Sequence, residues 1–191
     1  MEKGLLIILS GPSGVGKGTV RKYITAKKGF DFEFSISMTT RAPRDNETDG
    51  VEYYFVTKEE FQRRLDADQF LEHAEFVGNY YGTPRDKVEE LRNQGKNVLL
   101  EIEINGATQV LEKTKGDDKV ISFFLTPPSL DKLEERIRAR KSETEDVIKM
   151  RLEKGANEMK VAKFYDYVIK NDRVATAGNK IINIVKRKMK K

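Results

Sequence analysis

Short apolar runs recur along the chain and are suited to strands that are buried on both faces. They occupy residues 5–9, 98–104, 120–125 and 167–169, and helical patterns separate most of them. Strands that alternate with helices are typical of a parallel sheet covered by helices. The pattern therefore predicts an α/β fold with a parallel core sheet.

Three positions predict where helices begin. Thr57 and Glu60 have the spacing of a capping box, and Ser129 can cap the helix that follows it. Thr83 followed by Pro84 predicts a third helix start. These boundaries frame the polar segments discussed next.

Residues 35–82 break the alternation of strands and helices. The segment is rich in Thr, Arg, Asp, Tyr and Gly and contains a short strand-like piece at residues 53–56. It can be an ordinary surface excursion with a hairpin. A long loop without a function is uncommon, however, and these residue types suit phosphate and base contacts, so we expect an inserted binding lobe.

A glycine-rich run directly after the first apolar segment predicts a phosphate-binding loop. Its glycines let several backbone N–H groups converge on phosphate oxygens, and its lysine adds a positive charge. A helix that follows from Thr19 would point its positive end at the same anion. The alternative is a chance match in a lysine-rich chain. The run consists of Gly11, Pro12, Ser13, Gly14, Val15, Gly16, Lys17 and Gly18.

The loop departs from the usual pattern at its end. Gly18 stands where Ser or Thr would reach Mg²⁺, and Thr19 follows one step later. Magnesium keeps several waters and binds substrate phosphates, so a water-mediated contact from Thr19 would serve.

Composition excludes several kinds of chemistry. The 191 residues contain no cysteine and a single histidine, so thiolate and imidazole metal clusters are excluded. No apolar run is long enough for a membrane span or signal peptide, which predicts a cytoplasmic protein. The net charge is +5, with basic and acidic residues mixed. The basic residues 186–191 are typical of a helix C-terminus; an RNA-binding patch is the alternative.

Several motifs together resemble the guanylate kinase family over nearly the whole chain. Besides the glycine-rich loop they are SISMTTRAPR at 35–44, GVEYYFV at 50–56, FLEHAEF at 70–76, GNYYGT at 78–83 and EIEING at 101–106. The resemblance implies a P-loop NTPase three-layer fold. It implies a core at 4–34 and 84–186, a GMP-binding lobe at 35–83 and a helical lid at about 133–150.

The resemblance also implies transfer of the γ-phosphate of ATP to GMP, with Mg²⁺ accompanying ATP. Neither nucleic acid nor membrane is expected as a partner. The use of deoxy-GMP and any protein partner stay open.

Side chains of the inserted segment suit the acceptor phosphate. Arg41 and Arg44 are three residues apart and can converge on one dianion, and the hydroxyls of Tyr53 and Tyr81 can complete its hydrogen bonds. Solvated arginines and core tyrosines are the alternative interpretation.

Base selection is expected at Glu72. Guanine presents N1–H and an amine as parallel donors, which one carboxylate accepts together, whereas adenine N1 would repel it. The resemblance implies that Ser37 and Thr83 contact the remaining base edge and that Glu103 belongs to the GMP site. Alternatively, one of Glu101 and Glu103 can be a mere charge at the end of the strand predicted at 98–104. The family usually has Asp where Glu103 stands.

Charge for the transferring phosphoryl group is expected from the lid. Arg136 and Arg140 are four apart on a predicted helix, Arg151 follows, and together with Lys17 they would neutralise the transition state. Salt bridges to neighbouring glutamates are the alternative. The resemblance places Asn171 near the adenine of ATP.

Two other functions are compatible with parts of the sequence. A guanylate-kinase-like protein-binding module would keep the fold without catalysis, but such modules generally lack an intact phosphate loop. A P-loop ATPase that binds nucleic acid would need a localised basic face with stacking aromatics.

Overall fold

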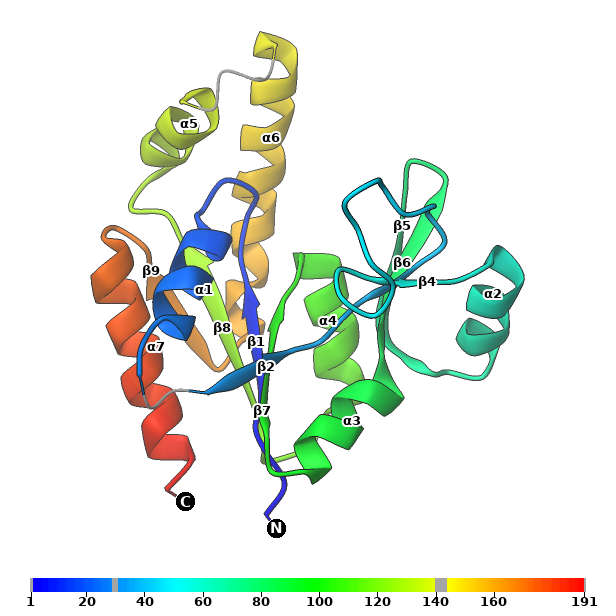
Figure 1. The fold of residues 1–191 in the computed structure, drawn as a ribbon. Helices are drawn as coiled ribbons and strands as arrows, with labels where there is room; N and C mark the ends of the chain where they lie inside the picture. Colours follow the sequence, from blue (N-terminus) through cyan, green and yellow to red (C-terminus); the bar gives the residue numbers. More distant parts are fainter. Residues whose placement is uncertain (1, 29–30, 140–143, 191) are drawn as a thin grey trace. The chain divides into compact units, whose positions relative to one another are not determined.

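The computed structural model describes residues 2–28, 31–139 and 144–190. The chain forms two compact units (Figure 1). One comprises Met1–Leu6, Glu33–Leu100 and Asn105–Lys119, and the other comprises Ile7–Phe32, Glu101–Ile104 and Val120–Lys191. We call them the acceptor unit and the loop unit, after the predicted functions of the residues that they contain.

A parallel five-stranded sheet confirms the predicted α/β fold. Its strand order is β2-β7-β1-β8-β9. All residues of β1 are buried, as its apolar sequence requires. The strands are β1 (Leu6–Ser10), β2 (Phe32–Phe34), β7 (Asn97–Glu101), β8 (Val120–Thr126) and β9 (Tyr167–Lys170).

Helices of the loop unit pack on one another through small and apolar residues. In α1, Tyr23 lies so close to Gly178 of α7 that a Cβ on Gly178 would stand 2.4 Å from the Tyr23 ring. Leu133 and Ile137 of α5 form a core with Ile148 of α6. The helices are α1 (Lys17–Thr25), α5 (Leu130–Arg138), α6 (Glu145–Glu158), a 3₁₀ helix (Met159–Phe164) and α7 (Val174–Lys188).

The acceptor unit contains a second sheet of order β4-β3-β6-β5. Phe61 and Phe70 stack in its core with ring centroids 4.4 Å apart, beside the buried Met38. Its strands are β3 (Met38–Thr39), β4 (Tyr54–Phe55), β5 (Phe70–Phe76) and β6 (Asn79–Pro84), and its helices are α2 (Lys58–Asp66), α3 (Arg85–Asn93) and α4 (Ile104–Lys113).

The predicted helix starts are confirmed in two of three cases. The Ser129 hydroxyl accepts from the backbone N–H of Lys132, and the Thr57 hydroxyl accepts from that of Glu60. The Glu60 carboxylate pairs with two arginines of α2 rather than completing the capping box. The third predicted helix, α3, is present but begins one residue later than expected, because Pro84 and not Thr83 precedes its first residue and Thr83 belongs to β6.

One predicted boundary is corrected. The strand predicted for residues 98–104 ends at Glu101, and α4 begins at Ile104, so Glu103 lies between the two elements. At the other end of the chain α7 ends at Lys188, so residues 186–188 form its last turn, as predicted for a helix C-terminus.

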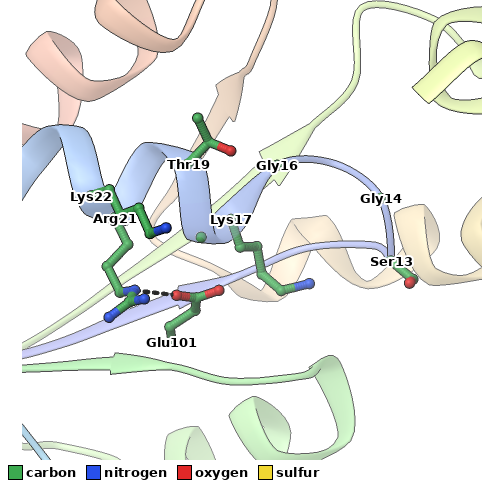
Figure 2. Close-up of a pocket in the computed structure, with 9 residues that line it drawn as sticks. Ser13, Gly14, Gly16, Lys17, Thr19, Arg21, Lys22 and Glu101 are labelled. Carbon is green, nitrogen blue, oxygen red and sulfur yellow. Dashed lines mark ion pairs between the residues drawn. The ribbon is translucent and has the colours of Figure 1, made fainter. Parts of the chain in front are cut away.

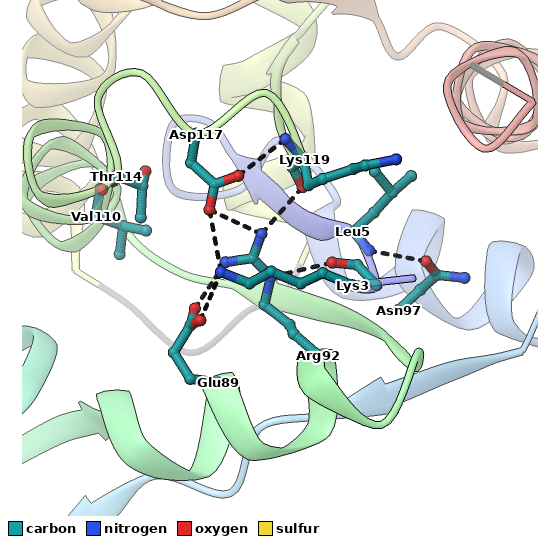
Figure 3. Close-up of polar contacts among 10 residues, drawn as sticks. Lys3, Leu5, Glu89, Arg92, Asn97, Val110, Thr114, Asp117 and Lys119 are labelled. Carbon is teal, nitrogen blue, oxygen red and sulfur yellow. Dashed lines mark hydrogen bonds and ion pairs between the residues drawn. The ribbon is translucent and has the colours of Figure 1, made fainter. Parts of the chain in front are cut away.

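A buried arginine ties together segments of the acceptor unit (Figure 3). The fully buried guanidinium of Arg92 donates to the Gly4 carbonyl at 3.1 Å and to the carboxylates of Glu89 and Asp117 at 2.7 and 2.9 Å. Lys3 pairs with the same two carboxylates.

None of the described helices has the length and apolar character needed to cross a membrane.

Candidate active site

The glycine-rich loop joins β1 to α1 in the loop unit and has the backbone geometry of an anion cradle. Gly11, Gly14 and Gly16 have φ values of 147°, 86° and 97°, in the region that favours glycine. A Cβ on Gly11 would stand 2.5 Å from the carbonyl oxygen of Leu125, so no side chain fits there. Helix α1 begins at Lys17, two residues earlier than predicted, so its N-terminus opens onto the loop.

Lys17 folds back over the loop. Its ammonium donates to the carbonyl oxygens of Gly11 and Pro12 at 2.6 and 3.4 Å. Burial lowers the pKa of Lys17 below its usual value, while the charges of Glu103, Glu101 and Glu158 oppose this shift. A phosphate could replace the carbonyl contacts and supply a full negative charge.

The loop is braced by a side chain from α5 and by one after β9. The Arg136 guanidinium donates to the carbonyl oxygens of Val15 and Asn171 at 3.1 and 2.8 Å. The side-chain amide nitrogen of Asn171 also donates to the Val15 carbonyl oxygen, and its buried side-chain oxygen Oδ1 has no hydrogen-bond partner among the described residues. Both predicted residues therefore contact the loop.

Of the other predicted lid arginines, Arg151 reaches the loop and donates to the Ser13 hydroxyl at 2.5 Å. Arg140 lies outside the described residues. Of the three glutamates considered as alternative partners of these arginines, Glu134 and Glu145 pair with Arg138, and Glu135 pairs with Lys132.

A pocket of about 450 Å³ borders the loop and the start of α1 (Figure 2). Glu101 points into it and pairs with Arg21 at 2.6 Å. A Cβ on Gly18 would lie 3.5 Å from a Glu101 oxygen, which places the carboxylate directly beside the start of α1. Thr19 is exposed and points away from Glu101 in Figure 2.

The residues of this pocket suit Mg²⁺ only together with a phosphate ligand. No group of three or more acidic or histidine side chains that could hold a metal occurs in the part of the chain that the structure describes. Glu101 offers one carboxylate beside the loop, and Glu103 is exposed nearby in sequence. Magnesium typically combines one or two carboxylates with waters and substrate phosphates, which this arrangement fits.

In the acceptor unit, predicted phosphate contacts gather around Arg41. Its guanidinium lies 5.5 Å from the centre of the Tyr53 ring, and the Tyr53 and Tyr81 rings are 6.0 Å apart. Glu47 holds Arg41 with two hydrogen bonds of 2.8 Å. These contacts raise the pKa of Arg41, mainly through the hydrogen bond to Glu47, with a smaller contribution from Tyr81.

Two further predicted residues lie at the margin of this group. Arg44 is exposed, and its backbone N–H donates to Glu47 at 2.9 Å. Ser37 is half-buried, and its carbonyl accepts from the backbone of Tyr54, which follows Tyr53. Among the described residues, neither side chain forms a hydrogen bond or ion pair with Arg41.

Glu72 and Thr83 face each other across β5 and β6. The two residues are register partners, and the Thr83 hydroxyl donates to one Glu72 oxygen at 2.5 Å. Burial raises the pKa of the Glu72 carboxyl above its usual 4.5, although hydrogen bonds from Thr83 oppose the rise. A half-buried carboxylate with one oxygen held in place suits recognition of paired N–H donors.

Three residues of these sites were not predicted. Glu47 forms an ion pair with Arg41, and Arg21 forms one with Glu101. Gly106 lies against Glu72. Neighbourhood in sequence could have indicated Glu47, which is six residues from Arg41. Nothing in the local sequence indicates the other two.

Comparison with known proteins gives one consistent result. The sequence profile of the family described as guanylate kinase matches residues 3–188. A guanylate kinase of Mesoplasma florum is 52% identical over 97% of this chain, which spans 62% of that protein, and one of Bacillus cereus is 51% identical over 96% of this chain and 88% of its own length. The crystal structure of guanylate kinase from Anaplasma phagocytophilum is 34% identical, with a TM-score of 0.72 over 100% of this chain and 88% of that one.

Proposed function

Because this chain belongs to the guanylate kinase family, whose members are ATP:GMP phosphotransferases, we propose specific roles in that reaction for the residues of its two units. The loop unit binds ATP, and the acceptor unit binds GMP. The observation that carries the second assignment is the arrangement along β6. Tyr81 and Thr83 are two residues apart on this strand and therefore face the same side, about 7 Å apart.

This spacing separates a phosphate subsite from a base subsite. Arg41 and Tyr53 accompany Tyr81, and Glu72 accompanies Thr83. The GMP phosphate binds at the first group, with Arg44 turning toward it from the loop. The guanine N1–H and amine donate to Glu72, with Ser37 and Thr83 beside the base. Glu103 completes this site or contacts a metal-bound water.

In the loop unit, ATP phosphates bind the backbone N–H groups of residues 13–19. Lys17 exchanges its carbonyl partners for the β- and γ-phosphates, and the side-chain oxygen Oδ1 of Asn171, which has no partner among the described residues, accepts from the adenine amine. Arg136, Arg140 and Arg151 supply positive charge around the transferring group. Phosphoryl transfer needs little covalent chemistry from the protein, so alignment and charge account for the rate enhancement.

Mg²⁺ enters with ATP and would be held by phosphate oxygens and waters, with Glu101 as the protein carboxylate beside Gly18. When bound, it neutralises charge on the phosphates. Thr19 remains a candidate for a water-mediated contact. A proposed lid at about 133–150 carries Arg136 to the site and limits hydrolysis of ATP by water.

A Glu72→Gln variant tests the base-reading role. An amide offers one acceptor and turns a donor toward guanine, so we expect the KM for GMP to rise about 10- to 100-fold, as loss of a hydrogen bond to a charged group implies. The KM for ATP should not change. Glu75→Gln on the exposed part of β5 is the matched control. An equal change for both nucleotides would contradict the assignment.

A further inference from the structure

One face of α4 follows the edge of β5 next to Glu72. Gly106, Gln109 and Lys113 are spaced three and four residues apart, so they lie on the same side of the helix. Each lies against a different point of β5: Glu72, the His73 backbone and the Phe70 carbonyl, respectively. Because β5 is the last strand of its sheet, its outer backbone groups need partners from outside the sheet.

Gln109 supplies such partners directly beside Glu72. Its amide oxygen accepts from the His73 backbone N–H at 3.1 Å, and its amide nitrogen donates to the His73 carbonyl at 3.0 Å. The register of β5 shifts between Phe70 and Glu72, so pairing with β6 is irregular at this point. The two hydrogen bonds with Gln109 therefore hold the β5 backbone next to the point where its pairing with β6 is irregular.

Gly106 lies against the carboxylate itself. A Cβ built there would stand 2.8 Å from the second oxygen of Glu72 and 3.2 Å from its carboxyl carbon. The first oxygen is held by Thr83. Gly106 is in the first turn of α4, where backbone N–H groups favour a negative charge.

We infer that Gly106 and Gln109 are positioning residues that set the orientation of the Glu72 carboxylate and thereby the selectivity for guanine. Gln109 fixes the backbone from which Glu72 projects. Gly106 leaves the space that the second oxygen occupies. The inference rests on the proposed role of Glu72 in reading the base.

A Gly106→Ala variant separates this role from a structural one. Alanine is the better helix former, and the atom it meets is the end of a flexible side chain, so the melting temperature should stay the same or rise. The added methyl displaces the carboxylate, and we expect the KM for GMP to rise at least about tenfold, the loss that one charged hydrogen bond implies. The KM for ATP should not change. An unchanged KM for GMP would overturn the role of Gly106.

A Gln109→Met variant tests the clamp on His73, with Lys113→Met as the matched control. Both variants remove a contact from α4 to the β5 backbone, so both should lower the melting temperature. Only Gln109→Met should reduce the preference for GMP over inosine monophosphate, which lacks the guanine amine, by about tenfold. Equal selectivity in the two variants would assign Gln109 a purely structural role.

Measuring Glu72→Gln in the same assays distinguishes this inference from the proposal beneath it. If Glu72→Gln leaves the preference for GMP over inosine monophosphate unchanged, the base-reading role itself fails. If Glu72→Gln removes the preference but Gly106→Ala and Gln109→Met retain it, only the positioning role is refuted. Loss of preference in all three supports both.

Discussion

The cationic side chains that we propose to contact phosphate are held in different ways in the two units. In the loop unit, Lys17 and Arg136 donate to neutral backbone carbonyls. In the acceptor unit, Arg41 is paired with the carboxylate of Glu47. A phosphate displaces a carbonyl at little electrostatic cost, whereas it must share or displace a full negative charge at Arg41.

This difference fits the tasks that we propose for the two units. The loop presents backbone N–H groups and cations that donate to neutral carbonyl groups, which suits any nucleoside triphosphate. In the acceptor unit, Glu47 orients Arg41 and Thr83 orients Glu72. Side chains held in fixed orientations suit discrimination among monophosphates. Four predictions test how far the contrast extends.

The largest effect is expected at Arg92, a buried, carboxylate-paired arginine outside the two proposed sites. An Arg92→Met variant leaves Glu89, Asp117 and the Gly4 carbonyl without their buried partner, so the free energy of unfolding should fall by about 3 kcal/mol. Denaturant unfolding measures the loss. Arg63→Met, which removes an exposed pair with Glu60, should cost less than about 1 kcal/mol. Equal losses would mean that burial does not decide the contribution of these pairs.

The next effect concerns the loop unit. A Lys17→Ala variant removes the charge that balances the transferring phosphate, so kcat should fall by at least about 10²-fold, as when one preorganised donor is lost elsewhere. The KM for GMP should change little, because no acceptor residue is altered. Lys27→Met, outside the pocket, serves as the control in a coupled assay. A folded Lys17→Ala protein with normal turnover would refute the role of the loop lysine.

Much of the loop unit could be predicted from sequence because its site is local. The glycines and Lys17 lie within eight consecutive residues after a buried strand, so spacing alone predicted the cradle. The acceptor residues were predicted from family motifs, but their pairing was not. Thr83 contacts Glu72 because the two residues are register partners on β5 and β6. Gly106 contacts it from α4, whose first residue, Ile104, was predicted to end a strand. Such contacts depend on tertiary structure, which residue spacing does not encode.

The third effect concerns Arg41. An Arg41→Met variant should raise the KM for GMP about 10- to 100-fold, since a charge-assisted phosphate contact is lost, while the KM for ATP stays constant. Because this arginine is less buried than Arg92, its loss should also destabilise the protein less. Arg85→Met, which removes an exposed pair in the same unit, controls for altered net charge. A rise in the KM for ATP alone would invert the proposed division between the units.

The smallest effect is a dependence on pH that we expect from Glu72 in the acceptor unit. Burial raises the pKa of Glu72 above 4.5, so its carboxylate takes up a proton at a higher pH than an ordinary glutamate does. The protonated form accepts one guanine donor fewer, and the KM for GMP should rise severalfold as the pH falls through this raised pKa. The GMP phosphate titrates near pH 6 as well, so the measurement is the ratio of KM values for the native protein and Glu72→Gln at each pH. This ratio should approach one on acidification.

Since the folded state binds the proton more tightly than the unfolded state, ionised Glu72 lowers stability at neutral pH, and stability is regained as the pH falls through the raised pKa. Glu72→Gln should therefore unfold at a higher denaturant concentration than the native protein at pH 7, and at a similar one at low pH. A ratio of KM values that is constant with pH would show that the charge of Glu72 does not contribute to binding GMP.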